Sequence, residues 1–289
     1  MIRTITADRV EAYRDRQYRR MPSLRLVDEE DALAFVDAVG FCFLFGSKRI
    51  PAPTLWAAIC GSNKPVPRQH NDADLGKAWR WKDSLPSHGH VYYGKLLRDT
   101  ATLVSLELLP AFYALSPNYG DIDDYLLQYE DGRLTVEAKS VYESLMNEGA
   151  MATSRLRQVA GMAGGGANAR RFDRALTELQ RELKIVKVGI SDANRWGYAY
   201  VYDLFVRAFP DIPIAARDIP SDEAMDSIAL RHLRNVGIAT ERHLQMLFRW
   251  EAWEWERLKD RLAEGGQVDR HVQIEGQRGA CLALVGTGL

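Results

Sequence analysis

The sequence predicts a mainly α-helical protein with short β wings, an α+β fold class of small helical domains that each end in a hairpin. Three observations predict this class. Helical patterns followed by β-rich runs occupy residues 133–203, and the same order of patterns recurs over residues 221–286. The third observation is size, because 289 residues, of which 46% are hydrophobic, suffice for two or three compact domains.

The central segment begins with three helical patterns. The run Leu134–Asn147 carries apolar residues at the i, i+3/i+4 and i+7 spacing of one buried face, and Gly149 stops it. A short second helix is expected from Thr153, and a third over Ala169–Leu183 after the glycine-rich loop 163–168. The apolar face of the third helix consists of Phe172, Leu176, Leu179 and Leu183.

Two β-rich runs close this segment. They are Ile185–Val188 and Tyr198–Tyr202, and the turn-forming residues 191–194 and Gly197 lie between them, as in a hairpin. Three helices and a terminal hairpin form a winged helix-turn-helix, a module that places one helix in the DNA major groove and the hairpin beside the backbone. We therefore expect residues 133–205 to be one such domain.

The third helix of this module has a basic start. Residues 151–190 contain eight Lys/Arg and three Asp/Glu, in a chain whose net charge is −1. Arginines at a helix N-terminus oppose the helix dipole, and a bound anion such as a phosphate group would neutralise them. The alternative is a set of ordinary exposed helix residues on a dimerisation or protein-docking module. The predicted DNA-binding residues are Arg155, Arg157, Arg170, Arg171, Arg174 and Lys187.

A second module is expected at the C-terminal end. A helix opens at Ser221 with acids in its first turn, a short helix begins at Thr240, and a third covers Glu251–Glu264. Runs 268–274 and 281–285 are expected to form its β pair. The third helix starts with acidic residues, which argues against DNA binding by that helix: Glu251, Glu254 and Glu256.

The expected organisation has five parts. Residues 1–26 contain seven arginines and three acids, which is typical of a basic arm on nucleic acid and equally of a charged amphipathic helix folded on the domain. The parts are a basic N-terminal arm (1–27), a helical, degenerate winged-helix domain (28–132), the central winged helix (133–205), a linker (206–220) and a C-terminal winged helix (221–289).

Composition excludes several classes of protein. A net charge near zero excludes a broadly basic, histone-like binder, so a basic surface must be local. The three cysteines, Cys42, Cys60 and Cys281, lie far apart with no CxxC pair, which favours reduced thiols over disulfides or zinc. No apolar signal-peptide core follows Met1, and the longest apolar stretch, Val39–Phe45, is too short to span a bilayer. We expect a cytoplasmic monomer without membrane segment, cofactor or metal.

Seven segments of the chain together resemble one known family. They are 152–157, Arg171-Phe-Asp-Arg-Ala-Leu-Thr-Glu-Leu-Gln180, 185–189, Phe35–Phe45, Leu55-Trp56, Trp79-Arg-Trp-Lys-Asp83 and Tyr92–Arg98. With these segments the chain resembles the AlkZ-related proteins of the AlkZ/YcaQ superfamily of bacterial DNA glycosylases. The resemblance covers about residues 30–286, and its implications are a tandem winged-helix architecture that cradles duplex DNA, damaged DNA included, and hydrolytic release of alkylated or crosslinked bases.

The chain departs from this family at the catalytic motif. Active members carry Gln-x-Gln or Gln-x-Asp where this chain has Phe41-Cys-Phe43, which cannot orient a water or stabilise an oxocarbenium-like sugar. Replacement groups are expected in residues 63–99, with Asp83 to position water and His88 to relay a proton. The aromatic residues there are candidates to stack on an extruded base, although such stretches are more often core: Trp79, Trp81, Tyr92 and Tyr93.

Three functions follow from these patterns. The first is a DNA-binding tandem winged-helix protein related to the alkylation-repair and crosslink-repair glycosylases, with a divergent active site. The second is an active glycosylase that hydrolyses the N-glycosidic bond of alkylated purines. The third is a winged-helix protein-interaction module without DNA binding, for which an exposed apolar patch around Trp253 and Trp255 would be the sign.

Overall fold

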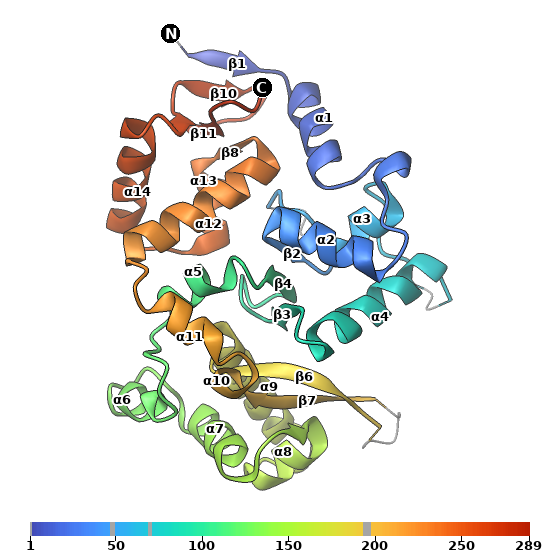
Figure 1. Cartoon of the computed structure of the whole chain (residues 1–289), viewed down its shortest axis with the longest axis vertical. Helices are drawn as coiled ribbons and strands as arrows, with labels where there is room; N and C mark the ends of the chain where they lie inside the picture. The colour runs from blue at the N-terminus through green and yellow to red at the C-terminus, as the bar shows by residue number, and fades with distance from the viewer. Residues whose placement is uncertain (1, 47–49, 69–70, 193–197) are drawn as a thin grey trace. The chain divides into compact units, whose positions relative to one another are not determined.

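The computed structural model describes residues 2–46, 50–68, 71–192 and 198–289 (Figure 1). The chain folds into two compact units. Unit 1 consists of Met1–Trp79 together with Ser221–Leu289, and unit 2 consists of Arg80–Pro220. Each unit is a mixture of helices and small sheets, as the sequence predicts.

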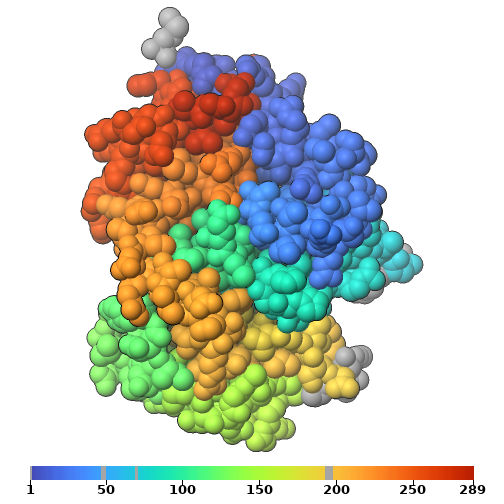
Figure 2. All heavy atoms as spheres, viewed as in Figure 1, coloured from blue at the N-terminus to red at the C-terminus, as the bar shows by residue number. Residues whose placement is uncertain are grey.

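Both ends of the chain fold together in unit 1. Strand β1 (Arg3–Ile5) pairs in parallel with β10 (Val272–Ile274), and the N-terminal segment lies against the C-terminal one in the space-filling view (Figure 2). The buried guanidinium of Arg14, on α1 (Ala7–Gln17), donates to the carbonyl oxygens of Val236 and Ile238 at 3.2 and 2.8 Å. Residues 3–17 are therefore a folded part of unit 1 and not a free basic arm.

Capping residues define the other helices of the N-terminal half. Helix α2 (Glu29–Val39) begins at Asp28, whose carboxylate accepts from the backbone N–H of Asp31 at 2.9 Å, and ends at Gly40 with a positive φ. Strand β2 (Phe41–Phe43) follows at once. A 3₁₀ turn (Pro22–Leu24), α3 (Leu55–Cys60) and α4 (Ala73–Ser87) complete this part.

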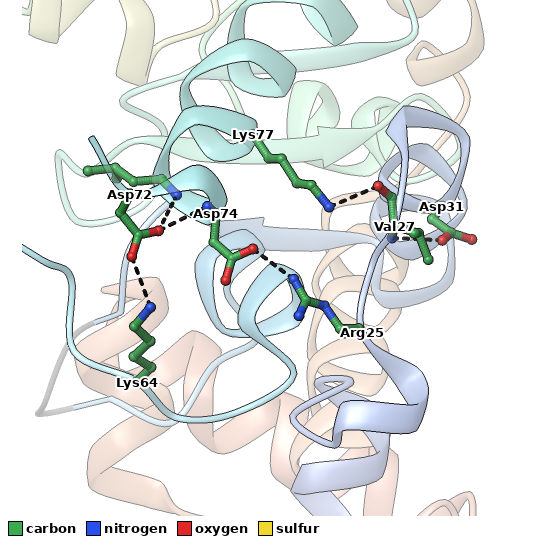
Figure 3. A network of polar contacts seen from close by, with 8 residues as sticks. Arg25, Val27, Asp31, Lys64, Asp72, Asp74 and Lys77 are labelled. Atoms are coloured by element: carbon green, nitrogen blue, oxygen red, sulfur yellow. Dashed lines mark hydrogen bonds and ion pairs between the residues drawn. The ribbon is translucent and has the colours of Figure 1, made fainter. Parts of the chain in front are cut away.

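Polar contacts fasten the start of α4 (Figure 3). The Asp72 carboxylate accepts from the backbone N–H groups of Asp74 and Leu75 at 2.9 and 3.0 Å, which satisfies donors that have no partner within the helix. The same carboxylate binds Lys64 at 3.0 Å, and Asp74 binds Arg25 at 2.7 Å. These ion pairs hold the start of the helix that carries the predicted site residues Trp79, Trp81 and Asp83.

Unit 2 contains the central module. Its elements are α7 (Val136–Glu148), β5 (Met151–Ala152), α8 (Thr153–Val159), α9 (Ala167–Arg181), β6 (Ile185–Ser191) and β7 (Ala199–Leu204). Strand β7 lies between β5 and β6, and both of its pairings are antiparallel. The predicted pairing of the two β-rich runs is thus confirmed, whereas residues 193–197 of the intervening turn lie outside the described residues. Phe172, Leu179 and Ile185 belong to the core of this module.

The remaining elements of unit 2 flank this module. Strands β3 (Val91–Gly94) and β4 (Thr102–Ser105) form an antiparallel pair, and α5 (Leu109–Ala114) and α6 (Asp124–Glu130) follow. Two short helices, α10 (Phe205–Ala208) and α11 (Asp211–Ala216), cover much of the expected linker 206–220. Helices of four and six residues are too short to show a period, which explains why the sequence pattern gave no sign of them.

The C-terminal part of unit 1 has the element order of the central module. Helix α12 (Ser221–Val236) leads to β8 (Ile238–Thr240), α13 (Glu241–Phe248), α14 (Ala252–Glu264), β9 (Val268–Asp269) and β11 (Cys281–Leu284). Strand β11 lies between β8 and β9, as β7 lies between β5 and β6. The predicted run 268–274 is two strands, because a turn closed by Asp269 accepting from the His271 backbone N–H separates β9 from β10.

Among the described residues, no helix is both long enough and apolar enough to span a membrane.

Candidate functional site

The start of α9 presents a basic surface. Its N-cap is Gly166, which offers no side-chain acceptor, and its first turn contains no acid. Arg170, Arg171 and Arg174 are exposed because the opposite, apolar face packs into the core. Arg171 pairs with Glu137 at 2.8 Å, whereas neither Arg170 nor Arg174 forms an ion pair with the residues that the structure describes.

The two predicted arginines of α8 differ in their surroundings. Arg155 is exposed and pairs with Glu148 at 3.1 Å. Arg157 is half-buried, with its guanidinium carbon 5.0 Å from the ring centroid of Phe172 and a nitrogen 3.8 Å from Asp173. Arg157 therefore contributes to the packing of the module, while Arg155 lies at the surface.

Lys187 requires a correction. The sequence places it at the surface, but the side chain on β6 is buried, with only 8% of the residue exposed. Its Nζ lies 4.2 and 4.1 Å from the ring centroids of Tyr93 and Tyr200. Burial, followed by the charges of Lys82 and Lys95, lowers the pKa of Lys187 to about 7. The two rings favour the ammonium, but burial and the like charges outweigh them. A surface phosphate cannot reach this amine directly.

A second buried lysine, Lys82, lies near it on α4. Its Nζ is within 2.5 Å of an Asp83 oxygen and donates to the hydroxyls of Tyr198 and Tyr200, both at 2.7 Å. The Tyr198 hydroxyl in turn lies 3.0 and 3.1 Å from the two Asp83 oxygens. Burial lowers the pKa of Lys82, and the carboxylate of Asp83 partly opposes this. Asp83 is thus held by its neighbours.

Lys82, Asp83 and Tyr200 line a narrow depression in unit 2 that is too tight to hold a water molecule. The structure brings together three predicted residues, Asp83, Tyr93 and Lys187, with Lys82 and Tyr200, which the sequence reasoning missed. The signal for the tyrosines was present, because alternate tyrosines on a strand, here 198, 200 and 202, share one face. The lining of this depression does not include His88, which is exposed in the turn after α4, with its ring 5.6 Å from that of His90.

Three of the four predicted stacking residues are corrected. Trp81, Tyr92 and Tyr93 are buried, with 4%, 0% and 3% exposure, so no base can stack on them in this structure. The Tyr92 hydroxyl donates to the carbonyl oxygen of Gln180 at 2.8 Å, which gives this residue a structural role in unit 2. Trp79 is 42% exposed. Trp81, Tyr92 and Tyr93 are therefore core residues, and only Trp79 is at the surface.

The segment expected to hold the catalytic motif is an apolar strand. Phe41, Cys42 and Phe43 are all buried, and the ring of Phe41 stacks on that of His232 at a centroid distance of 5.7 Å. Burial raises the pKa of the Cys42 thiol to about 12 and lowers that of His232 to about 3, so both groups are uncharged at neutral pH. No group of three His, Cys, Asp or Glu side chains among the described residues could hold a metal ion.

Comparisons with known proteins identify the family. A sequence profile described as "AlkZ related" matches residues 26–249, which is more than half of the chain. The chain belongs to the AlkZ-related family. Its fold is similar to that of the Streptomyces sahachiroi DNA glycosylase AlkZ, with a TM-score of 0.60 and 14% sequence identity over 98% of this chain and 70% of that chain. A comparison with curated proteins gave no match. The β2 strand and the basic start of α9 therefore belong to an AlkZ-related fold.

Proposed function

We propose that this AlkZ-related protein binds duplex DNA through tandem winged helix-turn-helix domains and that its site for base release has diverged. The order helix, strand, helix, helix, strand, strand, with the last strand in the centre of the sheet, supports winged helices from α7 to β7 and from α12 to β11, where β10 is inserted before the last strand. The elements from α2 to β4 follow the same order along the chain, which supports a third.

The basic start of α9 carries the proposal. Helix N-termini have unsatisfied N–H groups and a positive dipole end, so they favour acids and anions. Arg170 at the end of the first turn and Arg174 one turn further along add two positive charges beside it, with no ion pair among the described residues and no acid in the first turn. A DNA phosphate would neutralise this arrangement. Such contacts set the position of the protein on the duplex without reading its sequence.

The apolar strand β2 supports the divergent site. Hydrolysis of an N-glycosidic bond needs a carboxylate or amide oxygen to orient water and stabilise the positive charge that develops on the sugar. Phe41 and Phe43 offer neither, and Cys42 is an uncharged, buried thiol. Asp83, the replacement that the sequence indicates, already accepts hydrogen bonds from Lys82 and Tyr198.

Fluorescence anisotropy with a labelled duplex, measured from about 50 to 300 mM salt, tests DNA binding. We expect Arg170→Ala/Arg174→Ala to lower affinity roughly ten- to a hundred-fold on every duplex sequence, and to reduce the salt slope by about two. Arg181→Ala is the matched control. It removes the same charge from the other end of α9, where Arg181 lies 3.7 Å from Asp99 and from Glu182.

Absence of duplex binding by the wild type at low salt would contradict the proposal and favour the protein-interaction module. An exposed apolar patch around Trp253 and Trp255 would favour that alternative. Of these two side chains only Trp253 is exposed, at 58%, while Trp255 is buried. The Arg257 guanidinium carbon lies 5.8 Å from the Trp253 ring centroid.

A single-turnover assay tests the divergent site. The substrates are duplexes that contain 7-methylguanine, 3-methyladenine or a nitrogen-mustard crosslink, and we expect no abasic sites above the uncatalysed level. Release of a base would instead support the active-glycosylase alternative. In that case Asp83→Asn would abolish release if Asp83 is the replacement carboxylate, while His88→Ala, at an exposed turn, would serve as the control.

A further inference from the structure

The described residues expose their large apolar side chains unevenly. Of the 17 such side chains that are at least 37% exposed, six lie between residues 119 and 136, around helix α6. They are Tyr119, Ile122, Leu126, Leu127, Tyr129 and Val136. Single exposed apolar residues are ordinary on a protein surface, whereas a cluster of them marks an interaction site.

Helix α6 directs these side chains outward by its period. Tyr125 and Gln128 are the buried side of the helix. Ile122, Leu126 and Tyr129 recur at the i, i+4 and i+7 spacing, so they lie along another side, which faces solvent.

The apolar surface continues onto the neighbouring helix α7, which lies beside α6 in Figure 1. The Nζ of Lys139 on α7 lies 5.0 Å from the ring centroid of Tyr129. Val136, 58% exposed, is three residues before Lys139 and so lies on the same side of α7. We call the surface formed by Ile122, Leu126, Leu127, Tyr129 and Val136 the α6 face.

Buried hydrogen bonds fix the α6 face in place. One carboxylate oxygen of Asp124 accepts from the backbone N–H groups of Tyr119, Gly120 and Asp121 at 2.7, 2.8 and 3.2 Å. The Tyr142 hydroxyl donates to the carbonyl oxygen of Ile122 at 3.0 Å. The apolar side chains are thus exposed by a folded segment, and a surface that is already ordered loses little conformational freedom when a partner binds.

The charge around the α6 face has one sign. Residues 119–131 contain five Asp/Glu and no Lys or Arg. Asp123 and Glu130 are exposed and form no ion pair with the residues that the structure describes, and Asp123 makes no capping hydrogen bond. Such a surface repels DNA phosphates and anionic lipid headgroups, which argues against a nucleic acid or a membrane as its ligand. It complements a partner that carries Lys or Arg.

We propose that the α6 face docks an amphipathic helix of a partner protein. The apolar side of that helix covers Leu126 and Leu127, and Lys or Arg residues on its flanks pair with Asp123 and Glu130. A helix fits because the ridge from Ile122 to Tyr129 has the spacing that packs between the side chains of a second helix. The proposal goes beyond DNA binding and does not depend on it, because the basic surface belongs to α9.

Fluorescence anisotropy with a labelled model helix tests the proposal. The probe is a synthetic peptide of leucine and lysine whose leucines recur at helical spacing, and a comparison peptide has glutamate in place of lysine. We expect the wild type to bind the lysine peptide roughly ten-fold more tightly than the glutamate peptide at about 50 mM salt, because only lysine complements Asp123 and Glu130.

Leu127→Ser tests the apolar part of the face. This side chain is 60% exposed, and its loss should lower the affinity for the lysine peptide roughly five- to ten-fold, because less apolar surface is covered. Ile214→Ser is the matched control, since Ile214 is 64% exposed on α11 of the same unit. It should bind the peptide as the wild type does. Thermal unfolding midpoints equal to that of the wild type would show that both variants are folded.

Asp123→Asn/Glu130→Gln tests the acidic part. We expect the affinity for the lysine peptide to fall roughly five-fold at low salt and to depend less on salt than in the wild type, because screening acts on the charges that were removed. Glu264→Gln/Glu275→Gln removes two exposed acids from unit 1 and should leave the affinity unchanged.

Three results would overturn the proposal. The first is a wild type that binds the lysine peptide no more tightly than about 1 mM. The second is equal affinity of Leu127→Ser and Ile214→Ser. The third is a wild-type dimer in analytical ultracentrifugation that Leu127→Ser dissociates, which would assign the face to a second copy of this chain. Duplex affinity should be the same in all these variants, so failure here would leave the proposed DNA binding intact.

Discussion

Helices α9 and α14 occupy the same position in two modules whose element order differs only by the extra strand β10 of the second, but their first turns have opposite chemistry. Helix α14 begins at Glu251, and the Glu254 carboxylate accepts from the Glu251 backbone N–H at 2.9 Å, one half of a capping box. Helix α9 begins at Gly166 with no cap and exposes three arginines within its first eight residues, Arg170, Arg171 and Arg174.

The difference shows how one architecture yields two surfaces. In α14 the chain supplies its own negative charge to the positive end of the helix dipole, so the helix start is complete without a ligand. Helix α9 has no acid in its first turn, and Glu137 pairs with Arg171, so we propose that an external anion neutralises Arg170 and Arg174. The two modules share the position of the third helix along the chain, while the side chains of its first turns set the charge of the surface there.

Removing the acid from α14 should produce the largest effect on stability. Glu254→Ala deletes the acceptor for the Glu251 N–H and a favourable charge at the helix N-terminus, so we expect the free energy of unfolding to fall by about 1 kcal/mol. Urea denaturation measures it, and duplex affinity should not change. Glu264→Ala, at the exposed last residue of the same helix, should be neutral. Equal losses in both variants would contradict the capping role.

Local sequence patterns were sufficient to predict helix α9 and the pairing of strands β6 and β7. Phe172, Leu176 and Leu179 predicted the buried face of α9, and the structure confirms it. The antiparallel pairing of β6 with β7 was also predicted, because β-rich residues flank turn-forming ones. Both features depend on residues close together in the sequence.

The surroundings of Lys187 could not be predicted in the same way. Lys187 lies in a strand whose neighbours are apolar, and an alternating pattern assigns a lone lysine to the solvent face. Its burial depends on Lys82 and Tyr93, which are about a hundred residues away in the sequence. Tyr92 is buried because its hydroxyl finds the carbonyl of Gln180, another distant partner. Contacts of this range leave no periodic signal.

A substitution at the start of α9 tests the same difference with a smaller expected effect. Ala167 is the exposed first residue of this helix, and Ala167→Asp would give α9 the acidic start of α14. We expect the free energy of unfolding to rise by about 0.5 kcal/mol, because an acid near the N-terminus interacts favourably with the helix dipole. The gain should shrink at high salt, which screens this interaction. Duplex affinity should fall several-fold, since the carboxylate repels the phosphate that Arg170 and Arg174 would bind. A stabilised variant with unchanged affinity would show that DNA does not approach the start of α9.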